Sequence, residues 1–136
     1  MPTRILHGAT VLLVEDHEGF RSILTNYLNS LGAKVIECRN FFQAKEHMAR
    51  QSANLVLTDL QLPDGDGFEL MAEVRKHQFA PAQNVPVIAM SALGNTVVNQ
   101  RLVATGFSSY LTKPFTPQQL IDTIQTALAG ADGTTP

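Results

Sequence analysis

Five side chains that could do chemistry follow four separate apolar segments of the chain. Glu15 and Asp16 come after the first of these segments, Asp59 after another, and Ser91 and Lys113 after two more. If the segments are parallel strands of one sheet, their carboxyl ends meet at one edge, where open α/β sheets bind ligands. The spacing therefore predicts a single site with three carboxylates, one hydroxyl and one ammonium group.

Three carboxylates at one edge of a sheet repel each other. Each pair of charges about 4 Å apart costs on the order of 4 kcal/mol at an effective dielectric constant of about 20. Lys113 alone could neutralise only one of the three charges. The remaining repulsion indicates either raised pKa values or a hard divalent cation, and Mg²⁺ accepts carboxylates together with water and phosphate oxygens. A dinucleotide site is disfavoured, because no Gly-x-Gly-x-x-Gly pattern follows the first segment.

The segments between these residues alternate between strand and helix patterns, which is typical of a parallel α/β sheet. Five apolar runs are candidate strands, at residues 10–14, 35–36, 55–57, 87–90 and 109–111. We expect the four strands that precede the site residues to be central in the sheet. Right-handed crossovers would place the helices, four between the strands and one after the last strand, on both faces of the sheet.

The helical stretches carry spaced apolar residues and paired capping residues. In the first helix, six apolar residues have the spacing that places side chains on one helix face, namely Phe20, Ile23, Leu24, Tyr27, Leu28 and Leu31. Three helix starts have a polar residue followed three positions later by Glu or Gln, which can satisfy two backbone N–H groups reciprocally. These pairs are Asn40 with Gln43, Asp66 with Glu69, and Thr116 with Gln119.

Composition indicates one domain of ordinary size. The chain has 136 residues, of which 44% are hydrophobic, and we expect a domain at residues 9–129, a lead at 1–8 and a flexible tail or linker start at 130–136. Ten basic and twelve acidic residues give a net charge of −2, which argues against direct binding of nucleic acid. The single cysteine, Cys38, is expected to be a buried structural thiol. With no apolar stretch near the roughly 20 residues that span a bilayer, we expect a cytoplasmic protein that does not enter a membrane.

The order of the site residues resembles that of response-regulator receiver domains from two-component signal transduction. That family carries an acidic pair after its first strand, a phosphoacceptor Asp after its third, Ser or Thr after its fourth and Lys-Pro after its fifth. Here these are Glu15-Asp16, Asp59, Ser91 and Lys113-Pro114, and the run Asp59-Leu-Gln-Leu-Pro-Asp-Gly-Asp-Gly67 resembles the family's loop before the third helix. The resemblance implies a flavodoxin-like (βα)5 three-layer sandwich with a five-stranded parallel sheet of order 2-1-3-4-5.

The resemblance also implies a reaction at Asp59. This carboxylate would take a phosphoryl group from a phosphohistidine of a histidine kinase or histidine phosphotransfer protein. Mg²⁺, or Mn²⁺ in its place, would be held by Glu15, Asp16, Asp59 and the backbone carbonyl of Gln61. The chain would then be a signalling phosphoacceptor, which catalyses only its own phosphorylation and dephosphorylation, rather than an enzyme with a separate substrate.

Further residues gain roles from the same resemblance. The Ser91 hydroxyl, the Ala92 N–H and the Lys113 ammonium would bind the phosphoryl oxygens, with Lys113-Pro114 as a cis peptide. Ser91 and Tyr110 would act as a switch, read out on the face formed by the helix after Ser91, strand 109–111 and the last helix. That face would bind a downstream protein or a second copy of the chain. The helix after Ser91 opens with Thr96-Val-Val-Asn99. Helix formation by these four residues is roughly 2 kcal/mol less favourable than by four alanines.

An EF-hand is one alternative that the residues allow us to test. Asp64, Asp66, Gly67 and Glu73 fall at loop positions 3, 5, 6 and 12 of such a calcium site. The first position would then be Leu62, which offers no ligand, and a strand rather than a helix precedes it. The sequence therefore excludes this reading.

Two other classes remain as rivals. Phosphatases with an Asp nucleophile have two Asp residues separated by one residue after their first strand, whereas Asp59 is followed by Leu60 and Gln61. A receiver-like binding module that never takes phosphate is the other, and such modules usually lack an acid or the lysine. This chain keeps all of them, and phosphorylation by acetyl phosphate with Mg²⁺ would separate the three classes.

Overall fold

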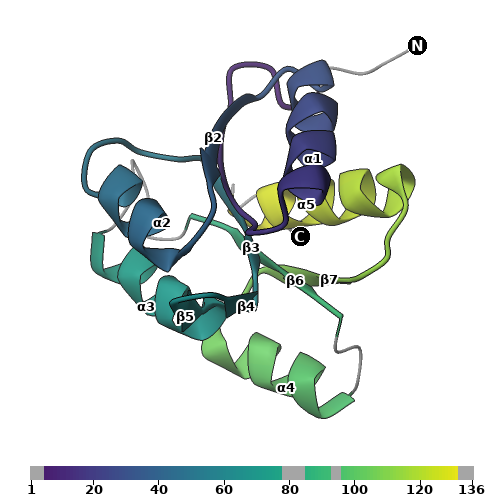
Figure 1. Cartoon of the computed structure of the whole chain (residues 1–136). Helices are drawn as coiled ribbons and strands as arrows, with labels where there is room; N and C mark the ends of the chain where they lie inside the picture. Colours follow the sequence, from purple (N-terminus) through teal and green to yellow (C-terminus); the bar gives the residue numbers. More distant parts are fainter. Residues whose placement is uncertain (1–4, 78–84, 93–95, 132–136) are drawn as a thin grey trace.

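A parallel sheet covered by helices on both faces makes up the computed structural model, which describes residues 5–77, 85–92 and 96–131 (Figure 1). The elements within those residues are β1 (Thr10–Val14), α1 (Glu18–Ser30), β2 (Lys34–Cys38), α2 (Phe41–Met48), β3 (Leu55–Asp59), β4 (Gln61–Leu62), β5 (Gly65–Asp66), α3 (Gly67–His77), β6 (Val87–Ser91), α4 (Thr96–Thr105), β7 (Ser109–Thr112) and α5 (Pro117–Ala131). The five-stranded sheet has the order β2-β1-β3-β6-β7. Because β6 and β7 are its fourth and fifth strands in the chain, the predicted order 2-1-3-4-5 and the flavodoxin-like fold are confirmed.

The strands differ in burial according to their place in the sheet. All residues of β3 and β6 are buried, as are four of the five in β1, since helices cover both faces of these central strands. In β7 only Leu111 is buried, because Ser109, Tyr110 and Thr112 are polar residues of an edge strand. The expectation that every site-bearing strand is central is therefore wrong for the strand that leads to Lys113.

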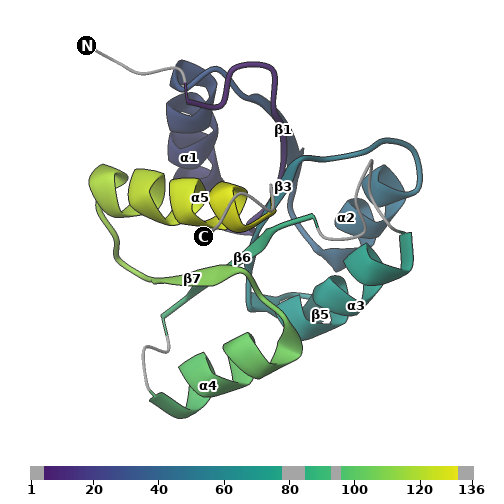
Figure 2. The ribbon, with the colours of Figure 1, turned by 180° about the vertical axis from the view of Figure 1, so that it is seen from behind.

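Two hydrophobic cores hold the sheet from opposite sides. Figure 2 shows from behind the helices that cover them, with α1 and α5 on one side and α2, α3 and α4 on the other. Val11 and Leu13 of β1 pack in the core beneath α1 and α5, whereas Leu12 and Val14 pack in the core beneath α2, α3 and α4. This alternation follows from the two-residue period of a strand. Burial of each such side chain stabilises the fold by roughly 2 kcal/mol. With both faces filled, the carboxyl edge of the strands is left as the place where polar groups gather.

Two of the three predicted capping pairs are confirmed. Asp66 with Glu69 and Thr116 with Gln119 each exchange two hydrogen bonds of 2.8–3.1 Å between side chain and backbone N–H. At α2 only half of the expected pair forms. The Gln43 N–H donates to Oδ1 of Asn40, but the Gln43 side chain accepts from the N–H of Arg39 instead of Asn40.

The first helix departs from its predicted apolar face at one residue. Leu24, Leu28 and Leu31 are buried as expected, whereas Ile23 is 66% exposed. The inner face also includes Arg21, a charged residue that the apolar pattern did not include. Among the described residues, no helix is both long and apolar enough to cross a membrane.

Candidate functional site

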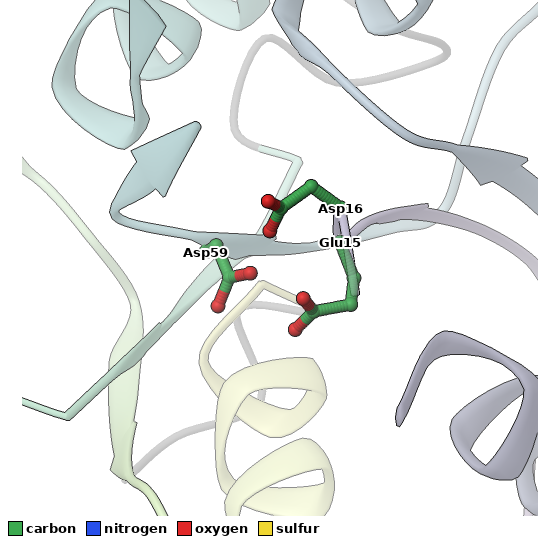
Figure 3. A group of neighbouring side chains, drawn as sticks. All are labelled: Glu15, Asp16 and Asp59. Atoms are coloured by element: carbon green, nitrogen blue, oxygen red, sulfur yellow. The ribbon is translucent and has the colours of Figure 1, made fainter. Parts of the chain in front are cut away.

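Three carboxylates converge at the carboxyl edge of the sheet, as predicted. Glu15 and Asp16 follow β1, and Asp59 is the last residue of the neighbouring strand β3. One oxygen atom from each carboxylate lies within 4.8 Å of the others, and Figure 3 shows the three side chains turned towards a common space. Glu15 and Asp59 are buried, while Asp16 is exposed. The parallel pairing of β1 with β3 brings these distant residues together.

Lys113 supplies the positive charge between two of the carboxylates. Its Nζ atom lies 2.8 Å from Oε1 of Glu15 and 2.6 Å from Oδ1 of Asp59. The same atom lies 4.8 Å from the centre of the Phe20 ring, whose quadrupole attracts a cation. The backbone N–H of Lys113 donates to the carbonyl of Ser91, and the Lys113-Pro114 peptide is cis, as expected. Lys113 thus contacts two of the three acids at once.

The buried acids have shifted pKa values of opposite direction. Burial raises the pKa of Asp59 to about 7, a hydrogen bond with Glu15 adds to this effect, and Lys113 opposes it. For Glu15, desolvation alone would raise the pKa, but hydrogen bonds with Asp59, Lys113 and the His17 N–H hold it below its ordinary value. Desolvation would lower the pKa of Lys113, but the two carboxylates raise it instead. Asp59 is therefore the acid of this pair whose protonated form burial favours, whereas Glu15 stays ionised more readily.

A cleft of about 900 Å³ surrounds these charges. Its lining includes every residue that the sequence singled out for cation or phosphate binding, namely Glu15, Asp16, Asp59, Gln61, Ser91, Ala92 and Lys113. Tyr110 does not line this cleft. It lies on β7 beside a smaller hollow and is 37% exposed.

A short hairpin forms one wall of the cleft, and the sequence did not predict it. Strands β4 and β5 pair antiparallel, with Gln61 opposite Asp66. The Gly67 N–H closes the hairpin by donating to the carbonyl of Leu60. A Cβ atom at Gly67 would lie 2.9 Å from the carbonyl oxygen of Asp59, so only glycine allows this close approach. Glycines before a helix were recognisable in the sequence, but a two-residue strand has too short a pattern to detect.

Arg21 is a further residue near the site that sequence reasoning missed. Its Nη1 donates to the backbone carbonyl of Glu15 at 2.9 Å, and its Nε lies 3.2 Å from Oε1 of Glu37 on β2. The guanidinium therefore fixes the turn that follows β1. A charged residue on the inner face of an otherwise apolar helix was the signal that could have found it.

Comparisons with known proteins agree with this fold and site. The family model for the response regulator receiver domain matches residues 11–125, and the chain belongs to this family. The transcriptional regulatory protein GltR of Pseudomonas aeruginosa is 30% identical over 128 residues, which are 94% of this chain and 52% of GltR. An uncharacterized 14.6 kDa protein of Leptolyngbya boryana is 33% identical over 115 residues, covering 85% of this chain and 86% of that protein.

A solved structure extends the comparison to the site. The receiver domain of sensor histidine kinase PA1611 from Pseudomonas aeruginosa, with a magnesium ion coordinated in its active site cleft, has a TM-score of 0.77. It is 30% identical and covers 90% of this chain and 98% of its own. The chain spans only about half the length of relatives such as GltR, so it corresponds to one part of those proteins.

Proposed function

We propose that this receiver domain takes a phosphoryl group onto Asp59 from a phosphohistidine of a histidine kinase or histidine phosphotransfer protein. The observation that carries the proposal is the convergence of Glu15, Asp16 and Asp59 within 4.8 Å, with Lys113 in contact with two of them. A buried acid whose charge is only partly compensated is suited to a reaction that brings both a cation and a phosphoryl group.

The donor set fits Mg²⁺. All candidate ligands are oxygen atoms, which hard divalent cations prefer. Burial and then the neighbouring Glu15 raise the pKa of Asp59, so a bound cation would favour its ionised form. Glu15, Asp16, Asp59 and the backbone carbonyl of Gln61 would hold the ion, and Mn²⁺ could take the same ligands. When bound, the ion supplies positive charge to the phosphoryl oxygens. The magnesium ion in the related PA1611 receiver domain supports this assignment.

The chain's own residues account for the remaining requirements of the transfer. A carboxylate oxygen of Asp59 attacks phosphorus while the P–N bond of the phosphohistidine breaks, leaving its electron pair on the imidazole nitrogen. Lys113, the Ser91 hydroxyl and the Ala92 N–H compensate the charge of the phosphoryl oxygens, which is the main contribution a protein makes to such transfers. Lys113 also favours the ionised, reactive form of Asp59 against the effect of burial.

The conformational change caused by phosphorylation would be transmitted to partners at the face formed by α4, β7 and α5. Ser91 at the end of β6 is opposite Thr112 in β7, so a pull on Ser91 reaches the strand that carries Tyr110. Tyr110 is partly exposed there, so a change in its side chain would alter the surface offered to a downstream protein or a second copy of the chain. The net charge of −2 favours a protein partner over nucleic acid. We place the receiver at residues 9–129 and, given its proposed phosphodonors, in the cytoplasm.

Phosphorylation by acetyl phosphate tests the central step. With Mg²⁺, the intact mass should rise by one phosphoryl group, and Asp59→Asn should abolish the gain while preserving the fold. Asp122→Asn, on the exposed surface of α5, is the matched control and should react as the wild type does. A phosphorylated Asp59→Asn variant, modified on the same peptide, would refute the assignment.

A further inference from the structure

Asp64 joins the hairpin at the cleft to a helix from another part of the chain. It lies between β4 and β5, and its two oxygens accept from the first two N–H groups of α2. Oδ1 accepts from the Phe41 N–H at 2.8 Å, and Oδ2 accepts from the Phe42 N–H at 3.0 Å. The third N–H of the helix, that of Gln43, is already satisfied by Asn40. Asp64 thus completes the cap of a helix more than twenty residues before it.

The charge of Asp64 suits this contact. A carboxylate at a helix N-terminus interacts favourably with the helix dipole, and its hydrogen bonds are stronger than those of a neutral acceptor. Slight desolvation alone would raise the pKa of Asp64, but the N–H donors of Phe41 and Phe42 lower it. The side chain is therefore ionised, and both of its oxygens are engaged, at neutral pH.

The hairpin is held by the Asp66–Glu69 capping pair, by Leu62, which packs against the core beneath α2, α3 and α4, and by the bonds of Asp64 at its outer end. It consists of two residue pairs, Gln61 with Asp66 and Leu62 with Gly65, and an isolated two-stranded hairpin is marginal in water. Its base is fixed by the Gly67 N–H, but none of its residues from 61 to 66 is fully buried. The outer end rests on the first turn of α2, where a Cβ atom at Gly65 would lie 3.0 Å from Cγ of Phe41. The two bonds of Asp64 hold this contact.

The opposite side of the same hairpin faces the cleft. Gln61, Leu62 and Pro63 line it, and Asp64 follows directly. The pyrrolidine ring of Pro63 fixes its own φ, so the link between Gln61 and Asp64 is short and stiff. A displacement of Asp64 from α2 would therefore move the Gln61 backbone at the cleft wall.

We propose that Asp64 is a positioning residue that fastens the Gln61 wall of the cleft to α2 and thereby sets the affinity of the cleft for a divalent cation. This inference rests on the proposed function, in which the Gln61 carbonyl is one of the cation ligands. Asp64 itself is not among the residues that line the cleft. Its substitution should therefore weaken cation binding without removing the reaction.

The test compares Asp64→Ala, Asp64→Asn and wild type in Mg²⁺ titrations that follow the backbone amide signals of Gln61 and Asp16 by NMR. Asp64→Ala removes both acceptors and should raise the Mg²⁺ dissociation constant by about tenfold, a typical effect of losing support for a metal ligand. Asp64→Asn keeps the size of the side chain and one acceptor oxygen, so its Mg²⁺ dissociation constant should lie between those of wild type and Asp64→Ala. The rate of phosphorylation by acetyl phosphate at saturating Mg²⁺ should stay within about twofold of wild type, because Asp59 and Lys113 are untouched.

Loss of a negative charge could by itself weaken cation binding, and two controls separate this effect from positioning. Asp122→Ala removes the same charge from α5, where its carboxylate accepts only from the neighbouring turn, and should leave the dissociation constant unchanged. The titrations are repeated in about 1 M KCl, where the Debye length falls to about 3 Å and exposed charges are screened. The difference between Asp64→Ala and wild type should persist there.

An unchanged dissociation constant in Asp64→Ala, or a difference that disappears at high salt, would overturn the inference. If Asp64→Ala does not fold, the Mg²⁺ dissociation constants of Asp64→Asn and wild type are compared at both salt concentrations instead, and the same two outcomes would overturn the inference. A wild-type protein that binds no Mg²⁺ would overturn both this inference and the proposed function. Wild-type binding that the Asp64 variants leave intact would overturn this inference alone.

Discussion

The ammonium nitrogen of Lys113 lies 2.6 Å from Oδ1 of Asp59, although one residue follows the edge strand β7 and the other ends the central strand β3. Lys113 also contacts Glu15, so one cation serves two buried acids. When both acids are ionised, two negative charges face one positive charge, so the site has an excess of negative charge even before Asp16 is counted. This imbalance makes both protons and divalent cations compete for the same oxygens.

Replacement of Lys113 should reveal this competition. Lys113→Met leaves Glu15 and Asp59 buried without a counter-charge, and we expect the free energy of unfolding to fall by about 1–3 kcal/mol without Mg²⁺. Addition of Mg²⁺ should stabilise the variant more than the wild type, because the ion replaces the lost charge. Urea denaturation with and without Mg²⁺ measures both effects. Lys34→Met, at an exposed position of β2, is the control. Equal stabilisation of both proteins by Mg²⁺ would contradict the shared-charge arrangement.

The stability of the metal-free protein should depend on pH through Asp59. Its pKa rises from 3.8 to about 7 on folding, so between these values the folded state binds a proton that the unfolded state has lost. Binding of this proton contributes fully to the free energy of unfolding below about pH 4. That contribution, on the order of 2–4 kcal/mol, is lost as the pH rises towards 7.

Asp59→Asn should abolish that part of the pH dependence and be more stable than wild type at pH 8. Denaturation in EDTA at several pH values between 5 and 8 measures the difference. Any contribution from the four histidines cancels, because both proteins contain them. Parallel curves for the two proteins would show that Asp59 does not hold the proton.

Mg²⁺ should raise the melting temperature through the acidic cluster. At ten times its dissociation constant a ligand stabilises the folded state by about 1.4 kcal/mol, which corresponds to roughly 4–6 °C for a domain of this size. Asp16→Ala should remove the response while changing the metal-free protein little, because Asp16 is exposed. Asp122→Ala should keep it. Identical melting of the wild type with and without millimolar Mg²⁺ would argue against a preformed site.

Phosphorylation should change the α4–β7–α5 face more than other parts of the chain. The first four residues of α4 are weak helix formers, so this helix is a candidate bistable element next to Ser91. Gly94, a glycine whose conformational freedom would loosen the loop before α4, lies outside the described residues. Amide hydrogen exchange with beryllofluoride, a phosphoryl mimic, should show changes concentrated in residues 91–115.

Ser91→Ala should suppress those changes, because the hydroxyl that draws β6 towards the phosphoryl group is lost. Ser22→Ala on the exposed side of α1 should leave them intact. Changes confined to α1 and α2, or uniform protection, would mean that the signal leaves through another face.

The sequence by itself determined the five strands of the parallel sheet, the five helices and their order, but not the β4–β5 hairpin. Strand cores such as residues 10–14 and 87–90 are apolar runs too strong to be anything but buried strands, and the alternation with helices then requires a parallel sheet. The convergence of Glu15, Asp16, Asp59, Ser91 and Lys113 followed from one geometric rule, because carboxyl ends of parallel strands share an edge. Local capping pairs were equally readable, since both partners lie within one turn.

Only the tertiary structure decided the contacts made between distant segments. The bonds of Asp64 to α2, of Arg21 to the Glu15 carbonyl and of Lys113 to two acids depend on side-chain reach across elements, which no local spacing encodes. The tertiary structure also decided that Leu24 and Arg21 are the buried residues of this part of α1, while Ile23 is exposed. The clustered carboxylates predicted raised pKa values or a cation, but the sequence did not tell which acid is affected. The pKa of Asp59 is raised because the fold buries it beside Glu15, against the opposing effect of Lys113.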